Sequence, residues 1–446
     1  MEPIPMAANF NKLKFFNFLF LGIGLFLLAI LLFQKSADPV FFRYSSRLLI
    51  LIWVIAAADV SLAWIIFYRI EALLKIERGL APLMLVMLFS IIFVELFLRV
   101  TNLPANKLTN NLPNLRMTLQ PAYKILPGLD PQISFTTDSL GFRTTKQVDY
   151  GNKPENTIRV IAIGGSAAES FYIDDQKTWP SLLGGYLDKY LENQRSVEVI
   201  NAGRSGEYAN QHLAKMKDYL KFSPNIYVVL LGFNDMTAYF QNLYRNNIMG
   251  AKEFVSSFDK FYDSSIKRVR SARIYRLFSL SYRILFQQKS FPTIDTHGQV
   301  VQSLRDLVKS AQIIDLPAES LKADTGFRGT VADIAAFCNK EKIQCILMTQ
   351  PTIYFDKMPA DLEGLIGFAP KLSGFKFSTG QLAKIMEAYN DVLLESAENS
   401  YVHVIDLAKN LPKDQSVFYD DVHFNNLGSE KVAKKLFEFI LKEKVL

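Results

Sequence analysis

Cysteine and histidine are scarce in this chain of 446 residues, which has two of the first and four of the second. Two cysteines are too few for a disulfide scaffold or for a Cys-rich zinc or iron–sulfur domain. Metal-binding and P-loop motifs are also missing, so the sequence predicts neither a metal nor an organic cofactor. Any catalysis must therefore come from ordinary side chains.

An excess of charge is missing too, because 50 Lys and Arg face 43 Asp and Glu and the net charge of +7 is spread thinly. One stretch, 267–289, holds basic residues without any acid, interleaved with apolar ones. Such a stretch favours either an amphipathic helix on an anionic membrane or a solvated helix packed on its domain. Nucleic acid is not an expected partner, since no binding motif accompanies the basic stretch.

Hydrophobic residues make up half of the chain, which excludes a disordered protein. Three apolar runs, 15–33, 48–68 and 80–98, each approach the ~20 residues of a membrane-spanning helix. The sequence therefore predicts a membrane domain over 1–100 with three transmembrane helices, and so a multi-pass membrane protein. The flanking Lys and Arg weakly favour an extracytoplasmic C-terminal part. For Asp59, in the middle of its run, pairing inside the bundle is favoured over a proton or ligand role, whereas Glu95 lies near the end of its run and can reach water.

Beyond the apolar runs the chain changes character twice. Residues 101–153 are rich in Asn, Pro and Thr and predict a linker or an extended approach segment, with a turn-like stretch at 138–143. From residue 154 to 446, short β-branched runs alternate with helical patterns, interrupted by an insertion at about 236–326. Strands are expected at 157–163, 197–201, 227–231, 344–349 and 402–406, and helices at 178–192, 208–222, 380–397 and 427–441. This order predicts an α/β domain with a mainly parallel sheet, whose sites lie where strands end.

Four short segments stand at or near such ends: Gly164–Ser166, Asn201–Gly203, Gly232–Asp235 and Asp420–His423. Each alone has a bland explanation, as a helix cap, a close backbone approach or local packing. Together they supply the parts of a nucleophilic site. A serine hydroxyl needs a base to remove its proton, and an imidazole suits that task.

The imidazole in turn needs a carboxylate to orient it, and Asp420 is three residues before His423. Asp421 is a rival for this role. Asn234 and the backbone amides of Gly203 and Ser166 could stabilise an oxyanion. The other histidines are poorer candidates by position: His212 on a helix, His297 in the insertion and His403 within a strand.

The set resembles the SGNH (GDSL-like) hydrolase family, which is named for Ser, Gly, Asn and His in four blocks. The resemblance covers about 157–441 without the insertion, and also includes the stretches 174–180 and 419–425. It implies a flavodoxin-like three-layer α/β/α domain. It further implies the following roles: Ser166 as nucleophile, His423 as base, Asp420 as its orienting acid, and Gly203 and Asn234 completing the oxyanion hole with the Ser166 amide.

Two details qualify the resemblance. Gly165 stands where many members have Asp, which we interpret as a feature of a subgroup. Ala168 interrupts the Gly-x-Ser-x-Gly pattern, which argues against the nucleophile elbow of α/β-hydrolases.

Together with the resemblance, the sequence favours a serine esterase or deacylase that is anchored in a bacterial cytoplasmic (inner) membrane and forms an acyl-enzyme from an ester of an envelope glycan or lipid. An O-acyltransferase that acetylates an envelope polysaccharide would use the same residues. A scaffold that binds membrane proteins through its three spans is the non-catalytic alternative. The expected partners are the acylated glycan or lipid, membrane lipids and, through the three spans, other membrane proteins.

Overall fold

A computed structural model of the protein describes residues 114–192, 194–243, 292–294, 297–369, 371–372, 375–396 and 401–446, together with 40–41, 44–45, 95–96 and 111. The chain divides into two compact units, Met1–Leu108 with Val255–Lys289, and Thr109–Phe254 with Ser290–Leu446. Of the first unit, the structure describes the antiparallel strands β1 (Val40–Phe41) and β2 (Tyr44–Ser45) and residues 95–96. The second unit carries the candidate site.

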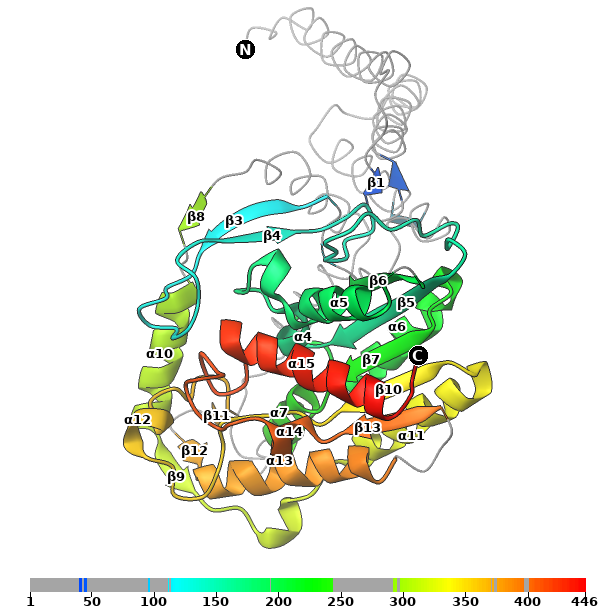
Figure 1. The fold of residues 1–446 in the computed structure, drawn as a ribbon. Helices are drawn as coiled ribbons and strands as arrows, with labels where there is room; N and C mark the ends of the chain where they lie inside the picture. Colours follow the sequence, from blue (N-terminus) through cyan, green and yellow to red (C-terminus); the bar gives the residue numbers. More distant parts are fainter. Residues whose placement is uncertain are drawn as a thin grey trace, which may run out of the picture. The chain divides into compact units, whose positions relative to one another are not determined.

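A five-stranded sheet forms the centre of the second unit (Figure 1). Its order is β13 (Val402–Ile405), β10 (Gln344–Met348), β7 (Ile226–Leu230), β5 (Thr157–Gly164) and β6 (Ser196–Asn201). Every neighbouring pair is parallel. The inner strands β5 and β7 are buried along their whole length, as continuous β-branched runs predict. The predicted parallel α/β sheet is thus confirmed.

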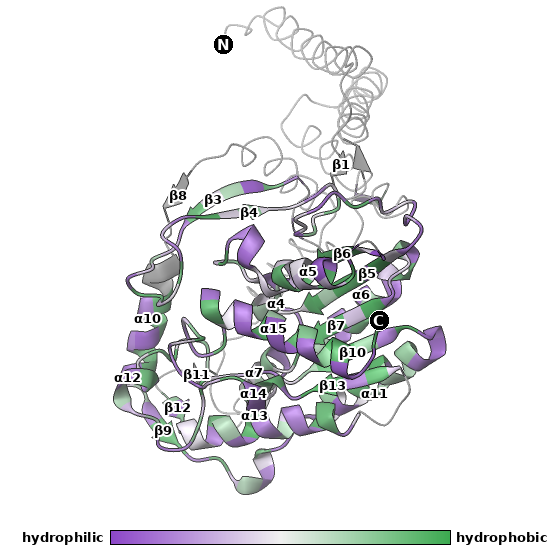
Figure 2. Cartoon of the chain, viewed as in Figure 1, coloured by the Kyte–Doolittle hydropathy of each residue, from purple (hydrophilic) through white to green (hydrophobic). Residues whose placement is uncertain are grey.

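Two groups of helices cover this sheet. One consists of α5 (Trp179–Tyr190) and α15 (Asn426–Lys442), which contact each other. The other consists of α6 (Ala209–Tyr219), α7 (Phe233–Leu243), α11 (Thr325–Glu341) and α13 (Thr379–Leu394). Side-chain oxygens start several of these helices: Thr178, Asp324, Ser378 and Asn425 each accept a first-turn amide. Figure 2 shows hydrophobic strands in the centre and hydrophilic residues along the outer helices.

The segment predicted to be a linker is instead folded onto this domain where the structure describes it. β3 (Arg116–Gln120) and β4 (Ile133–Thr136) pair in antiparallel fashion, and β8 (Pro292–Ile294) adds a parallel strand. A bridge between Arg143 and Asn201 continues the attachment to β6. The Asn- and Pro-rich composition marks the turns, but the buried Phe135 and Phe142 between them fix the segment to the domain.

The described part of the predicted insertion is also structured. It contains the end of α7, helix α10 (His297–Ser310), strand β9 (Gln312–Ile314) and the short helix η5 (Ala318–Ser320). β9 joins a small sheet with β11 (Lys371–Leu372) and β12 (Phe375–Phe377). Short helices complete the unit: η1 (Asp175–Lys177), η2 (Leu220–Phe222), α12 (Ala360–Glu363) and α14 (Leu407–Asn410). The basic stretch 267–289 lies outside the described residues.

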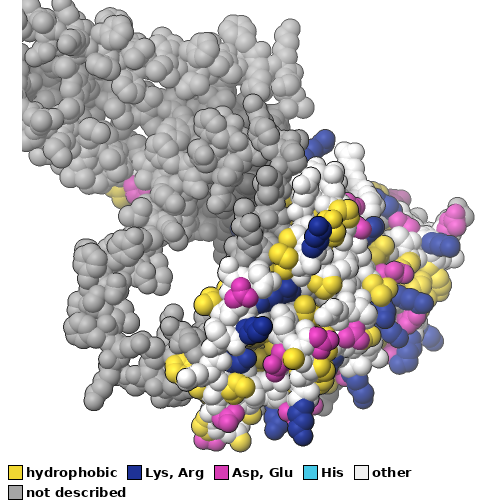
Figure 3. Space-filling view, turned by 90° about the vertical axis from the view of Figure 1, so that its left-hand side faces the viewer, with side chains coloured by type: hydrophobic (Ala, Val, Ile, Leu, Met, Phe, Trp, Pro, Cys, Tyr) yellow, Lys and Arg dark blue, Asp and Glu magenta, His cyan; other side chains and the backbone are white. Residues whose placement is uncertain are grey.

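In the ranges given above, none of the helices has both the length and the apolar character needed to cross a membrane. The three apolar runs lie outside the described residues, except for residues 95 and 96. The exposed face in Figure 3 carries charges of both signs, interspersed over the described side chains. Both cysteines form one disulfide, Cys338–Cys345, between the end of α11 and the start of β10.

Candidate active site

Ser166 is the first residue of the short helix α4 (Ser166–Glu169), directly after strand β5 and the Gly165 N-cap. This turn places the serine at the carboxyl edge of the sheet. Its Oγ lies 2.6 Å from Nε2 of His423, a residue 257 positions further along the chain. The fold therefore joins the first and last predicted blocks by a hydrogen bond.

Helix α4 is held by side chains from outside it. The last carbonyl oxygens of a helix have no partner within the helix. Here they accept hydrogen bonds from three side chains: Trp179 Nε1 to Ala167 O (3.1 Å), Asn201 Nδ2 to Ala168 O (2.8 Å), and Arg143 Nη1 to Glu169 O and Ser170 O (2.8 and 2.7 Å). These bonds fix the position of the helix that carries Ser166.

Arg143 is the most connected of these supports. It is 4% exposed and forms an ion pair with Asp175, with 2.6 Å between Nη2 and Oδ1. Its guanidinium carbon lies 4.3 Å from the centre of the Phe135 ring. Burial lowers the pKa of Arg143, and the charge of Asp175 partly offsets this. Sequence reasoning missed this role; its only signal was the turn-like stretch at 138–143.

His423 is bound on its other side by Asp420. Asp420 Oδ2 lies 2.7 Å from His423 Nδ1, while Oδ1 accepts the backbone amides of Val422 and His423 at 2.9 and 2.7 Å. The Asp420 carboxylate is fully buried. Burial alone would lower the pKa of His423, but the charge and hydrogen bond of Asp420 outweigh it and raise that pKa above its usual value.

Two aromatic rings enclose the imidazole. Tyr419 stacks on it at 5.5 Å between ring centres with 9° between the planes, and Phe368 meets it edge-on at 5.2 Å. Asp421 supports this wall, because it accepts hydrogen bonds from Tyr354 Oη (2.6 Å) and from the Phe368 amide (3.0 Å). Of the two rival acids, the structure thus places Asp420 against His423 and Asp421 behind Phe368.

The predicted oxyanion donors are not all brought together. Ser166 and Asn234 line one small pocket, where Asn234 Nδ2 donates to Glu207 O at 2.8 Å. Gly203 is not among the residues lining this pocket, and its amide donates to Asn201 Oδ1 at 2.9 Å. A Cβ at Gly203 would lie 2.3 Å from the amide nitrogen of Glu169, so this glycine permits close packing beneath α4.

Another glycine of the same loop, Gly206, is a further candidate for a backbone oxyanion donor, and the sequence analysis did not identify it. Its φ of +78° turns the backbone between two neighbours with fixed contacts. Ser205 donates its amide and hydroxyl to the buried Glu169 carboxylate, and Glu207 O accepts from Asn234. Gly206 is therefore held between α4 and Asn234. Its signal in the sequence was its place three residues after Gly203.

A buried charged cluster closes the far side of this pocket. Glu207 Oε2 lies 2.6 Å from Lys215 Nζ and 3.7 Å from Nδ1 of His212, which is 1% exposed. Burial, together with the charge of Lys215, lowers the pKa of His212 to about 3, so this imidazole is neutral. His212 lines the pocket despite its position on a helix. A pKa this low makes the ring a weak proton acceptor, so His212 is a wall of the pocket rather than a second base.

The other predicted alternatives lie away from Ser166. His403 Nε2 pairs with Gln344 Oε1 at 2.8 Å between β13 and β10, and His297 begins α10. Within the described part of the chain, no group of three or more His, Cys, Asp or Glu side chains is arranged to hold a metal ion.

Comparisons with solved structures find several distantly similar chains. An α/β hydrolase from the metagenome of Lake Arreo in Spain is 12% identical, with 65% of this chain and 96% of that chain covered and a TM-score of 0.35. The acetylxylan esterase Axe2 from Geobacillus stearothermophilus is 12% identical (64% and 94% covered, TM-score 0.34), and the acetyl xylan esterase AlAXEase is 15% identical (64% and 100%, 0.35). No curated protein matches the sequence.

The family comparison is more direct. The model of the GDSL-like lipase/acylhydrolase family matches residues 162–431, which is more than half of the chain. The matched region begins within β5, just before Ser166, and ends beyond His423. It therefore contains every residue described above as part of the Ser166 site except Arg143. The chain belongs to the GDSL-like lipase/acylhydrolase family and is an ester-acting serine hydrolase.

Proposed function

We propose that Ser166 is the nucleophile of this hydrolase, with His423 as its general base and Asp420 as the acid that orients the imidazole. One observation carries the proposal: the continuous hydrogen-bonded line from Ser166 Oγ through His423 to the buried Asp420. In this arrangement Nδ1–H donates to the carboxylate, which leaves Nε2 free to accept the serine proton.

The reaction proceeds in two halves. Ser166 Oγ bonds to the ester carbonyl carbon while its proton passes to His423 Nε2. The imidazolium then returns that proton to the departing alkoxide, and the ester C–O bond breaks to leave an acyl-enzyme. Water next loses a proton to His423 and attacks the acyl carbon, and the proton returns to Ser166 as the acid is released.

The oxyanion requires donors on the pocket side of Ser166. We assign this role to the Ser166 amide, which has no partner within α4, and to Asn234 Nδ2, after it leaves Glu207 O. Neither Gly203 nor Gly206 lines the pocket. Gly203 would have to release Asn201 Oδ1 to contribute, whereas the Gly206 amide donates to no acceptor in the described part of the chain, so we favour it as the third donor.

The acyl group is proposed to be acetyl. The pocket beside Ser166 and Asn234 has a cavity volume of about 10 Å3, which is room for roughly one water molecule. Buried side chains, among them Leu231, Gln350 and His212, line it. The small volume favours a methyl group over a longer acyl chain.

The nucleophile is tested by hydrolysis of p-nitrophenyl acetate. Ser166→Ala is expected to lower kcat by a factor of about 10³ or more, because no other group supplies the nucleophile. Ser310→Ala, an exposed serine at the end of α10, is the matched control and should behave as wild type. A fluorophosphonate should label the peptide containing Ser166; equal hydrolysis by Ser166→Ala would remove this residue from the mechanism.

The acyl preference is tested by comparing acetate with butyrate esters. Because the two extra methylenes of butyrate would collide with the side chains that line the pocket, kcat/KM for p-nitrophenyl butyrate should be lower than for the acetate ester by about tenfold or more. Leu231→Ala enlarges the pocket and should bring kcat/KM for the butyrate ester closer to that for the acetate ester. Thermal melting checks that this variant is folded. Equal rates on both esters in the wild type would contradict the proposal.

The acceptor and the location are further parts of the proposal. We favour water as acceptor and an ester of an envelope glycan or lipid as substrate, with the enzyme anchored by the three apolar runs before residue 101. Acetyl transfer to an added polysaccharide, abolished by Ser166→Ala, would instead indicate an O-acyltransferase. The disulfide Cys338–Cys345 supports an extracytoplasmic domain, since disulfides persist in oxidising compartments. A purely scaffolding role is disfavoured by the intact Ser166–His423 bond.

A further inference from the structure

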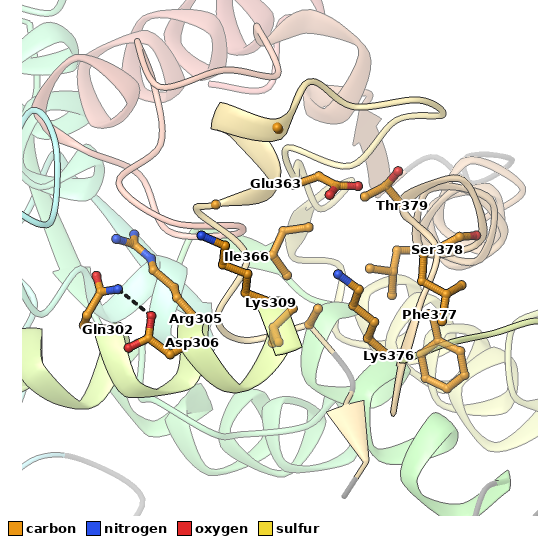
Figure 4. A pocket seen from close by; sticks show the side chains of 16 residues that line it. Gln302, Arg305, Asp306, Lys309, Glu363, Ile366, Lys376, Phe377, Ser378 and Thr379 are labelled. Atoms are coloured by element: carbon orange, nitrogen blue, oxygen red, sulfur yellow. Dashed lines mark hydrogen bonds between the residues drawn. The ribbon is translucent and has the colours of Figure 1, made fainter. Parts of the chain in front are cut away.

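A second and larger cavity lies between helix α10, helix α12 and the junction of β12 with α13 (Figure 4). Its volume is about 280 Å3, far larger than that of the pocket beside Ser166. Its floor is apolar and includes the buried Val308, Ile366 and Phe377. It therefore has the volume and the partly apolar lining of a small-ligand site.

Cationic side chains outnumber acidic ones in the lining of this cavity, by three to two. Lys309 extends into it from α10 and Lys376 from β12, and their ammonium groups face the same space in Figure 4. In the part of the chain that the structure describes, neither lysine forms an ion pair within 4.0 Å. The lining also contains two acids: Asp306, which accepts a hydrogen bond from Gln302 at 2.9 Å, and Glu363 from α12. Lys309 and Lys376 therefore face the cavity without an acid bound to either of them.

A third cation connects the cavity to the catalytic loop. Arg305, which is 8% exposed, lines the cavity and donates to Ile125 O and to Tyr419 O, each at 2.9 Å. Its Nε is buried and has no hydrogen-bond partner in the described part of the chain. An acceptor supplied from the cavity side would satisfy a donor that the protein leaves unmet.

The wall of the cavity is also the wall of the catalytic histidine. Ile366 and Ala369 line the cavity, while Phe368 between them packs edge-on against His423. Asp421 fixes this segment through the Phe368 amide. A ligand in the cavity therefore lies one backbone segment away from the imidazole.

We propose that this cavity is a subsite for an acidic sugar residue of the glycan substrate. Its anionic group lies between Lys309 and Lys376, its ring covers the apolar floor, and the hydroxyls of Ser378 and Thr379 meet its hydroxyl groups. The Ser378 hydroxyl accepts the Gln381 amide and keeps its own proton for donation. This inference rests on the proposed ester hydrolysis and adds a charge preference to it.

Kinetics on two acetylated oligosaccharides test the subsite, with acetylated oligogalacturonate as the acidic substrate and acetylated xylo-oligosaccharide as the neutral one. The wild type should prefer the acidic substrate. In the double variant K309Q/K376Q the ratio of kcat/KM, acidic to neutral, should fall about tenfold, mainly through a higher KM for the acidic substrate. Lys434→Gln, an exposed lysine on α15 without an ion pair, is the control and should keep the wild-type ratio. An unchanged ratio in the double variant would overturn the proposal.

Direct binding separates this inference from the proposed mechanism. Full-length Ser166→Ala should bind unacetylated oligogalacturonate in calorimetry, more weakly at high salt, and K309Q/K376Q in the same background should lose at least tenfold in affinity. Equal binding of neutral xylo-oligosaccharide, or binding to phosphatidylglycerol vesicles in place of the oligosaccharide, would contradict the subsite. If the Ser166 hydrolysis tests fail but oligogalacturonate binding still depends on Lys309 and Lys376, the proposed mechanism is wrong and the subsite stands.

Discussion

At the level of single residues, His423 is subject to two opposing influences on its pKa. Burial favours the neutral ring, and the charge of Asp420 favours the protonated one and prevails. A base must be neutral to accept the Ser166 proton, so the rising limb of the pH–rate profile should have its midpoint above the ordinary histidine value of about 6.5.

Asp420→Asn tests this balance. The substitution removes the main cause that raises the pKa of His423, so the midpoint of the rising limb should move to lower pH, while kcat falls by a factor of about 10³–10⁴. The pH dependence of p-nitrophenyl acetate hydrolysis measures both. Asp421→Asn is the control, because Asp421 binds Tyr354 and Phe368 rather than the ring, and its shift should be smaller. A larger shift in Asp421→Asn would reverse the assigned roles.

The sequence contained the reacting groups but not their supports. Ser166 and Asn234 stand near strand ends, where parallel topology gathers side chains, and His423 lies in the loop before the last helix, so their approach could be predicted from the four blocks. The position of Gly203 beneath α4 could not, since it depends on contact with the backbone of Ala168 and Glu169 from a different element. Arg143 was hidden for the same reason: its partners are carbonyl oxygens, which no residue pattern encodes.

At the level of elements, the close contact between the Gly203 loop and α4 has a measurable consequence. In Gly203→Ala the new methyl would meet Glu169 N and Ala168 C, at 2.3 and 2.6 Å, and would displace the helix that carries Ser166. We expect a loss of about 1–3 kcal/mol in the free energy of unfolding and a large fall in kcat.

Chemical denaturation and ester hydrolysis measure the two effects. Gly185→Ala in α5 is the matched control, because nothing lies within 4 Å of its added methyl, and it should stabilise the protein by up to about 1 kcal/mol. The Gly203 variant keeps its backbone amide. Unchanged stability and activity would therefore show that the contact with α4 is not tight.

The elements themselves were largely predictable. All five central strands and four of the covering helices were placed within a few residues, because buried parallel strands are continuous apolar runs. The stretch before residue 154 was misread as a linker. Its Asn and Pro residues dominate the composition, whereas Phe135 and Phe142 gain their role only by burial against distant residues.

At the level of the whole molecule, the disulfide Cys338–Cys345 links the fold to its compartment. If the domain lies outside the cytoplasm, both thiols should be oxidised in cells. Rapid alkylation of intact cells, followed by mass spectrometry of the peptide with and without reduction, measures this. The protein produced in a strongly reducing cytoplasm serves as the control. Fully alkylated cysteines in the native host would argue for a cytoplasmic domain, which reporter fusions after residue 101 would show independently.

The separation of Ser166 and His423 by 257 residues has a consequence for biosynthesis. The ribosome delivers the proposed nucleophile with the first strand of the sheet, but the proposed base follows only with the loop before α15. Under the proposed mechanism, a partly synthesised chain holds a serine that has no proton acceptor. We therefore expect reactivity towards acyl esters to arise only after nearly all of the domain has emerged.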